Sequence, residues 1–340
     1  MALAQPTFSD LEASSGRMTR RRRFLELLDS RIPWDAWAAR VEPFYPRAGG
    51  GRPPVPLRTM LLMYVVQVAF QLSDEGTEDA LWDSAAARSF VGCGDAVPDA
   101  TTLCRFRSLL SSNGLGRALF EELNASLAAE GLRMSAGTIV DATFVEAPSS
   151  TKNARRARDP EAHQAKKGQN WHHGFKAHVG LDAEAGTVHT LEVTAANVSD
   201  LAKAAALVRE GDADVWADAG YVGVAGWVGG TPAEAARWHV ARRKRSVPEG
   251  EGPAESMLAS VRSRVEHAFH ALKDLVGLRK TRYRGLAKVT DQLYSAFALC
   301  NCLLASRRPP LQGPPACAMG REWPRERLLE VLSAAAGAAA

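Results

Sequence analysis

The stretch TIVDATFV, residues 138–145, decides how the rest of the chain is interpreted. Its β-branched and aromatic residues predict a buried strand. Side chains alternate between the two faces of a strand, so Asp141 is expected to share a face with Ile139, Thr143 and Val145. A buried charge without a partner is costly. Asp141 is therefore either a structural residue held by an ion pair or hydrogen bonds, or a ligand-binding residue.

The segments that follow predict a sheet covered by helices. Four more strands are predicted, at residues 175–181, 187–194, 214–217 and 239–242. Helices are predicted at residues 200–210, 257–276 and 286–305. A meander of three strands followed by crossovers through helices is typical of a mixed sheet. We therefore expect a mixed α/β domain with a five-stranded sheet flanked by helices.

A second aspartate stands where a strand ends. Asp218 follows the apolar strand at residues 214–217 and precedes Ala219 and Gly220. In open α/β sheets the carboxyl ends of strands line the ligand crevice. The alternative is a turn-forming aspartate before glycine, which is common in any fold.

A glutamate on the helix predicted at residues 257–276 is the third acidic candidate. Arg262 and Glu266 are four residues apart, and Lys273 follows Glu266 by seven. At about 100° per residue, these three side chains fall within roughly 40° of one another, beside the apolar stripe. The alternative is an ordinary ion-pair face on a surface helix.

Carboxylates from two strand positions and one helix suit hard cations that prefer oxygen ligands. Asp141, Asp218 and Glu266 would together hold two Mg²⁺ or Mn²⁺ ions for phosphodiester chemistry. The neighbouring Arg262 and Lys273 would neutralise the phosphate.

The amino-terminal part of the chain predicts a different architecture. Residues 1–30 contain a basic run, Arg20, Arg21, Arg22 and Arg23, which is expected to form a flexible arm that contacts DNA phosphates or is simply solvated. Residues 31–133 have helical periodicity and predict a helical domain, for which DNA binding is a hypothesis, because such periodicity is common in bundles with no DNA role. The sheet domain is expected at residues 134–306. The Pro-, Gly- and Ala-rich residues 307–340 are expected to be a poorly ordered tail.

Composition and charge exclude several classes of protein. The sequence is 46% hydrophobic and 24% charged, with a net charge of only +4, so clustering of basic residues must carry any argument for nucleic acid. The five cysteines form no C-x-x-C pair, which argues against a disulfide framework and a zinc site. No apolar run approaches the roughly 20 residues of a membrane span. We expect a cytoplasmic protein without a signal peptide.

Several motifs together resemble bacterial insertion-sequence transposases of the DDE type, in the group named after insertion sequence five. The resemblance covers most of residues 30–305. It includes VPDATTLCRFR at 97–107, IVDAT at 139–143, GFKAH at 174–178, WADAGY at 216–221 and the signature Arg-x3-Glu-x6-Lys from Arg262 to Lys273.

The resemblance implies an RNase H-like catalytic domain with Asp141, Asp218 and Glu266 as metal ligands. It implies a DNA transposase that acts as a homodimer on terminal inverted repeats. Lys176, on the strand that matches the Gly-aromatic-Lys motif, is either a DNA contact or a solvated strand lysine. Ala259 stands where the family signature has tyrosine, which puts full activity in question. The alternatives are an inactive, transposase-derived DNA-binding protein and a related nuclease that cleaves without strand transfer.

Overall fold

A computed structural model describes residues 18–47, 49, 53–131, 137–152, 154, 156–167, 169–242 and 252–307. The first 17 residues of the expected arm and the tail from residue 308 lie outside these ranges. The described chain forms two compact units. The helical unit takes in the segments up to Ser126 together with Leu272–Leu278 and Ala287–Ser306, and the sheet unit takes in Leu127–Ala271 and Arg279–Leu286.

Short polar residues set the starts of the helices in the helical unit. Ser73, Ser84 and Asp99 each accept a hydrogen bond from the first turn of the helix that they precede. Ser84 also ends the preceding helix, so residues 74–91 form two helices. The bounds are α2 (Arg20–Arg31), α3 (Trp34–Val41), η1 (Glu42–Phe44), α4 (Leu57–Phe70), α5 (Asp74–Asp83), α6 (Ala85–Val91), α7 (Ala100–Ser112), α8 (Leu115–Ala129) and α11 (Leu286–Ser306).

Helix α2 corrects part of the expected flexible arm. Thr19 caps the helix by accepting a hydrogen bond from the Arg22 amide, and Leu25 and Leu28 are buried. Residues 20–30 are therefore a packed helix, because the leucines that follow the arginines supply an apolar face.

Helix α11 completes the core of the helical unit, although it comes last in the described chain. The Tyr64 hydroxyl on α4 donates to Ser295 Oγ at 2.9 Å, and Asn301 Nδ2 donates to Asn124 Oδ1 at 2.7 Å. Both bonds are buried. The sequence analysis placed residues 286–305 with the sheet, since periodicity shows that a helix is amphipathic but not which partner covers its apolar face.

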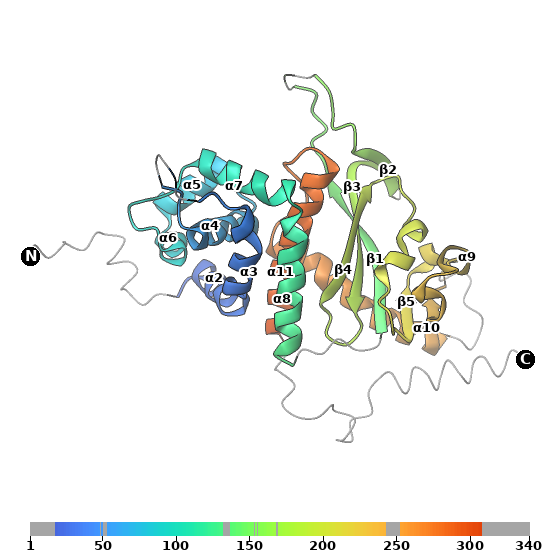
Figure 1. Cartoon of the computed structure of the whole chain (residues 1–340). Coiled ribbons are helices and arrows are strands. Elements are labelled where there is room, and N and C mark those ends of the chain that lie inside the picture. The colour runs from blue at the N-terminus through green and yellow to red at the C-terminus, as the bar shows by residue number, and fades with distance from the viewer. Residues whose placement is uncertain are drawn as a thin grey trace, which may run out of the picture. The chain divides into compact units, whose positions relative to one another are not determined.

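The sheet has six strands in the described part of the chain, one more than expected (Figure 1). The strands are β1 (Gly137–Glu146), β2 (His163–Lys167), β3 (Asn170–Asp182), β4 (Val188–Ala195), β5 (Asp214–Ala217) and β6 (Arg237–Val240). The additional strand β2 lies in a segment for which the sequence analysis predicted no strand. It pairs with the first residues of β3, which is longer than predicted.

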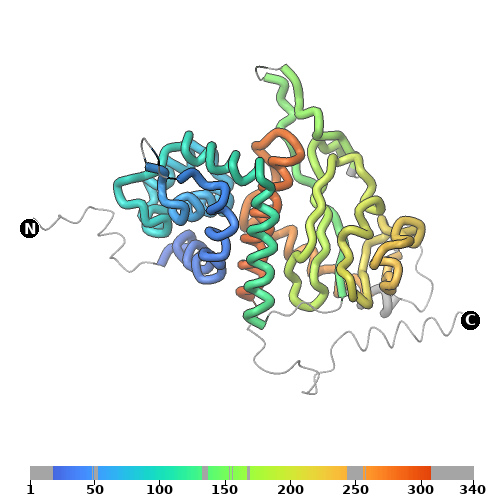
Figure 2. Tube along the Cα trace, in the orientation of Figure 1, coloured from blue at the N-terminus to red at the C-terminus, as the bar shows by residue number. Residues whose placement is uncertain are grey.

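Strand pairing gives the order β4-β3-β1-β5-β6, with β2 beside the beginning of β3. Strand β1 is antiparallel to β3 and parallel to β5, and β6 is parallel to β5. The chain path through these strands can be followed in Figure 2. This mixed sheet with flanking helices has the RNase H-like arrangement that the sequence predicted.

Different elements cover the two faces of the sheet. Helix α10 (Gly252–His270) packs against β1 and β5. Val140, Val215 and Ala217 point to the other face, into a core shared with Leu207 and Tyr221. The helix expected at residues 200–210 is instead two 3-10 turns, η2 (Asp200–Lys203) and η3 (Ala205–Leu207).

The short elements after β5 are η4 (Ala219–Tyr221), α9 (Ala225–Val228) and η5 (Pro232–Glu234). Helix α10 continues into a π-helical segment, η7 (Ala271–Leu275). Within the described ranges, no helix combines the length and apolar character needed to cross a membrane.

Candidate active site

Asp141 lies in the middle of β1, and its side chain is half-buried. Its carboxylate accepts a hydrogen bond from the Ala142 amide at 2.7 Å. Burial raises the pKa of Asp141 to about 6, the Ala142 amide lowers it, and the negative charge of Asp218 raises it further. Asp141 is therefore a carboxylate whose negative charge the protein compensates poorly.

Asp218 is placed beside Asp141 by the parallel pairing of two strands. Ile139 on β1 is the partner of Trp216 on β5, and the two aspartates each stand two residues further along. The backbone of Asp218 is still extended, with φ −81° and ψ 175°, so strand alternation holds through this residue. Both aspartates therefore share one face at the carboxyl end of β5.

A glycine turn fixes the Asp218 side chain. Asp218 caps η4, and its Oδ1 accepts a hydrogen bond from the Gly220 amide at 2.8 Å. A Cβ atom on Gly220 would lie 2.8 Å from that same Oδ1 atom. The sequence Asp218-Ala219-Gly220 therefore allows the backbone to close around the carboxylate.

Helix α10 brings one of its two predicted site residues close to this pair. The positive charge of Arg262 lowers the pKa of Asp141, which places the guanidinium within electrostatic range of the carboxylate. Glu266 follows Arg262 by about one helical turn and is exposed. In the described chain no three His, Cys, Asp or Glu side chains converge as a metal site, so Glu266 does not complete a cluster with Asp141 and Asp218 in this conformation.

Two other residues of the family signature lie on the same helical segment. Lys273 follows Glu266, and Ala259 precedes Arg262. The expected alignment of Lys273 with Glu266 assumed about 100° per residue, but Lys273 belongs to the π-helical η7. Because a π turn holds more residues than an α turn, the alignment expected from α-helical geometry is wrong at Lys273. Lys273 groups with the helical unit. Ala259 is exposed on α10.

Lys176 is held by the protein itself. Its Nζ donates to the Val198 carbonyl at 2.8 Å and to Asp200 Oδ1 at 3.0 Å. It also lies 5.7 Å from the centre of the Phe144 ring, its cross-strand partner. Strand alternation puts Lys176 and Phe144 on the face opposite Asp141. In this conformation Lys176 orders the chain after β4.

Two further residues near the aspartate pair were missed by the sequence analysis. Asp200 at the start of η2 pairs with Lys176 and lies 3.5 Å from His178 Nδ1, and its negative charge raises the pKa of Asp141. Tyr221 is 1% exposed, and its hydroxyl has no hydrogen-bond partner among the described residues. Burial raises the pKa of Tyr221, and the charges of Asp200, Asp141 and Asp218 raise it further. Of these two residues, only Tyr221 lies in a motif that the sequence analysis quoted, WADAGY at 216–221.

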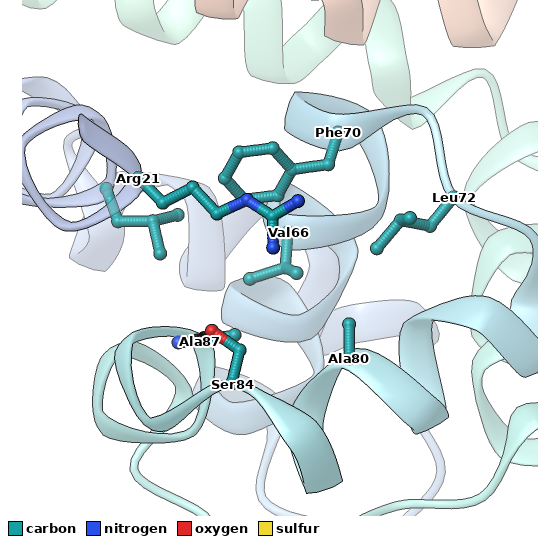
Figure 3. Close-up of a pocket in the computed structure, with 8 residues that line it drawn as sticks. Arg21, Val66, Phe70, Leu72, Ala80, Ser84 and Ala87 are labelled. Carbon is teal, nitrogen blue, oxygen red and sulfur yellow. Dashed lines mark hydrogen bonds between the residues drawn. The ribbon is translucent and has the colours of Figure 1, made fainter. Parts of the chain in front are cut away.

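The four arginines at the start of α2 differ in their surroundings. The Arg21 guanidinium lies 5.5 Å from the centre of the Phe70 ring. Figure 3 shows it at the edge of a small pocket of the helical unit that is lined by Val66, Phe70 and Ala80. Arg22 pairs with Glu26 at 3.0 Å. Arg20 and Arg23 are exposed and are the better candidates for contacts to a partner.

The donor set at the aspartate pair fits divalent cations. Asp141 and Asp218 present carboxylate oxygens from adjacent strands, and their mutual repulsion contributes to the raised pKa of Asp141. A hard cation bound between them would relieve that repulsion, and oxygen ligands are those that Mg²⁺ and Mn²⁺ prefer. Glu266 is the nearest acidic residue that α10 offers after Arg262.

Comparison with known protein families gives two matches. The family described as Transposase DDE domain matches residues 133–302, which include both aspartates, Arg262, Glu266 and Lys273. A second family, described as Transposase domain (DUF772), matches residues 14–109 in the helical unit. No solved structure was found to match the chain.

Proposed function

This chain belongs to the family of transposases that share the DDE domain, and we propose that it moves an insertion sequence of the insertion-sequence-five group. The protein binds the terminal inverted repeats of its element, cleaves phosphodiester bonds at the ends and joins the freed 3′-ends to target DNA. Its substrate places it in the bacterial cytoplasm, at the nucleoid.

The paired aspartates carry this proposal. Asp141 and Asp218 stand two residues beyond a matched pair on parallel strands, on one face of an RNase H-like sheet. With Glu266, they would hold two Mg²⁺ or Mn²⁺ ions. Ions bound there would activate a water molecule or a DNA 3′-hydroxyl and stabilise the leaving 3′-oxygen.

Glu266 would join the aspartates by a local rearrangement. It is exposed on α10, one turn beyond Arg262, so its carboxylate can change rotamer without disturbing the core. Arg262 is already within range of the Asp141 charge and would neutralise the phosphate that is cut. Lys273 is assigned to a phosphate of the same DNA strand.

The helical unit is assigned to recognition of the element's ends. Arg20 and Arg23 are exposed at the start of α2 and would contact phosphates, while Arg21 and Arg22 also have partners within the unit. Lys176 would reach DNA only by giving up its pair with Asp200. Because an element has two ends, the protein is expected to act as a homodimer on DNA.

Separate assays of cutting and binding test this proposal. Asp141→Asn and Asp218→Asn should each abolish metal-dependent cleavage of a labelled duplex that carries the element's end, while the same duplex is bound with unchanged affinity. Glu210→Gln, at an exposed acidic residue, is the matched control and should cleave normally. If either aspartate variant still cleaves, that residue is not a ligand.

A further inference from the structure

A two-stranded ribbon extends the sheet beyond the end of β1. Strand β2 pairs with residues 170–174 of β3, whereas β1 reaches only as far as Gly174 and β4 only to Phe175. In Figure 1, β2 lies at the end of the sheet where β3 begins. The ribbon, defined as β2 with residues 170–173, therefore has no third strand among the described residues. A two-stranded ribbon is only marginally stable by itself.

One face of this ribbon displays an aromatic side chain beside a cation. Trp171 and Lys166 are direct cross-strand partners, so both side chains stand on the same face. Trp171 is 66% exposed, which is unusual for so large an apolar side chain. Lys166 is also exposed, and neither strand of the ribbon contains an Asp or Glu.

The other face fastens the ribbon to the sheet. The ring of His172 lies 5.6 Å from that of Phe144 on β1, and its Nδ1 is 3.3 Å from Glu146 Oε1. These contacts involve His172, whereas about two thirds of the neighbouring Trp171 side chain stays exposed, at 66%. Its exposure is therefore better explained by a partner outside the sheet unit than by the stability of the fold.

We propose that this ribbon docks in a groove of the duplex DNA that flanks the cleaved phosphate, with Trp171 and Lys166 facing the DNA. The inference rests on the proposed function. A two-stranded β-ribbon fits the major groove, and a face with a lysine and no acid complements the phosphates.

The register of β3 sets where on the DNA this contact falls. Asp141 is the partner of Val179, and Trp171 lies about 26 Å further along β3 at about 3.3 Å per residue. That length corresponds to about 8 base pairs at about 3.4 Å per step. If the duplex runs along β3, as the proposal requires, the ribbon contacts it roughly three-quarters of a turn away from the cut.

Binding to duplexes of two lengths tests the proposal with the full chain and without metal. The duplexes carry the element's end and extend about 4 or about 16 base pairs to either side of the cut, shorter and longer than the reach of the ribbon. Trp171→Ala should bind the longer duplex about tenfold more weakly and the shorter one normally, because it loses apolar contact in the groove, while Trp171→Phe keeps most of the affinity. Lys166→Ala should lower the salt dependence of binding to the longer duplex by about one phosphate contact.

Trp227→Ala is the matched control, since Trp227 is 53% exposed on α9 of the same unit, and it should bind both duplexes normally. Equal binding of the longer duplex by Trp171→Ala and the unaltered protein would overturn the proposal. So would an effect that appears only with an unpaired flank, or a change in oligomeric state in place of a change in affinity. These results would leave the proposed function standing, whereas failure of the unaltered protein to bind either duplex would overturn both.

Discussion

The Asp218 carboxylate is held by the turn that follows it. This local geometry allows the position of the carboxylate to be changed without disrupting the fold. Oδ1 accepts from the Gly220 amide at 2.8 Å, at the place where a Cβ atom on Gly220 would intrude. The atom in the way is the end of a side chain and not backbone. A methyl group at residue 220 should therefore displace the carboxylate and leave the turn intact.

Gly220→Ala should reduce metal-dependent cleavage by about tenfold to a hundredfold, because a ligand that is misplaced by even a small distance loses most of its effect. Gly226→Ala is the control, since nothing lies within 4 Å of a Cβ atom there. Circular dichroism should be unchanged for both variants. Normal cleavage by Gly220→Ala would show that the position of Asp218 does not limit the reaction.

Asp291 is a second carboxylate whose negative charge the protein compensates poorly, and it is not one of the predicted site residues. It is 5% exposed on α11 and accepts a hydrogen bond from the Gly116 amide at 2.7 Å. Burial raises its pKa to about 6, and the Gly116 amide lowers it. The folded state therefore binds a proton more tightly than the unfolded state, so this residue makes the protein less stable as the pH rises from about 4 through about 6.

Asp291→Asn should remove that pH dependence. Between about pH 4 and about pH 8, the difference in free energy of unfolding between variant and unaltered protein should move in favour of the variant by at most about 3 kcal/mol. Urea unfolding at the two pH values measures it. A difference that does not change with pH would show that Asp291 has an ordinary pKa in the folded protein.

At the scale of elements, sequence patterns predicted the strands that carry the site better than the segments around them. The strand at residues 214–217 is confirmed as β5, and the strand at 138–145 is confirmed within β1. Both are apolar runs bounded by polar residues. Strand β2 was missed because HQAKK has neither alternating hydrophobicity nor β-branched residues, and it forms only by pairing with β3.

Gly174 tests how closely β3 must approach β1. A Cβ atom there would lie 2.2 Å from the Val145 carbonyl oxygen and 2.9 Å from the Ala147 amide, both backbone atoms. Gly174→Ala should therefore lower the free energy of unfolding by about 1–3 kcal/mol or more. Nothing lies within 4 Å of a Cβ atom on Gly229. Gly229→Ala should therefore change the free energy of unfolding by only about a few tenths of a kcal/mol. Equal unfolding midpoints for the two variants would contradict the pairing of β1 with β3.

For the whole molecule, the chain does not divide into consecutive domains. Helix α11 comes after the whole sheet unit and yet supplies the helical unit with buried contacts to Tyr64 and Asn124. The sequence analysis instead expected boundaries at residues 133 and 306. Local patterns specify elements, whereas pairing between segments more than 150 residues apart depends on tertiary packing that a single sequence does not display.

A fragment that ends at residue 131 should therefore fail to fold. It lacks α11, in which most residues from Val289 to Ala305 are buried, and loses both the hydrogen bond that Tyr64 donates to Ser295 and the one that Asn301 donates to Asn124. Thermal unfolding followed by circular dichroism should show no cooperative transition. Joining residues 272–306 to the fragment through a flexible linker should restore it. A cooperative transition of the fragment alone would show that the helical segments up to residue 131 are an independent domain.

The same limit explains what the sequence predicted of the site. Asp141, Asp218 and Arg262 stand on or directly after elements that strong local patterns predict, and the pairing of β1 with β5 and the packing of α10 bring them together. Asp200 and Tyr221 were missed because their approach to the pair depends on how η2 and η4 pack. Glu266 is the predicted ligand that remains outside the pair, so its role in metal binding is the part of the proposed site that most needs a test.

Incubation of the purified protein with a labelled duplex carrying its element's end, with and without Mg²⁺ or Mn²⁺, tests the account most directly. We predict metal-dependent nicking at the end that is lost in Glu266→Gln, with binding retained. Nicking that survives Glu266→Gln would contradict the three-carboxylate site. Binding without any cleavage by the unaltered protein would contradict the assignment of this chain as an active transposase.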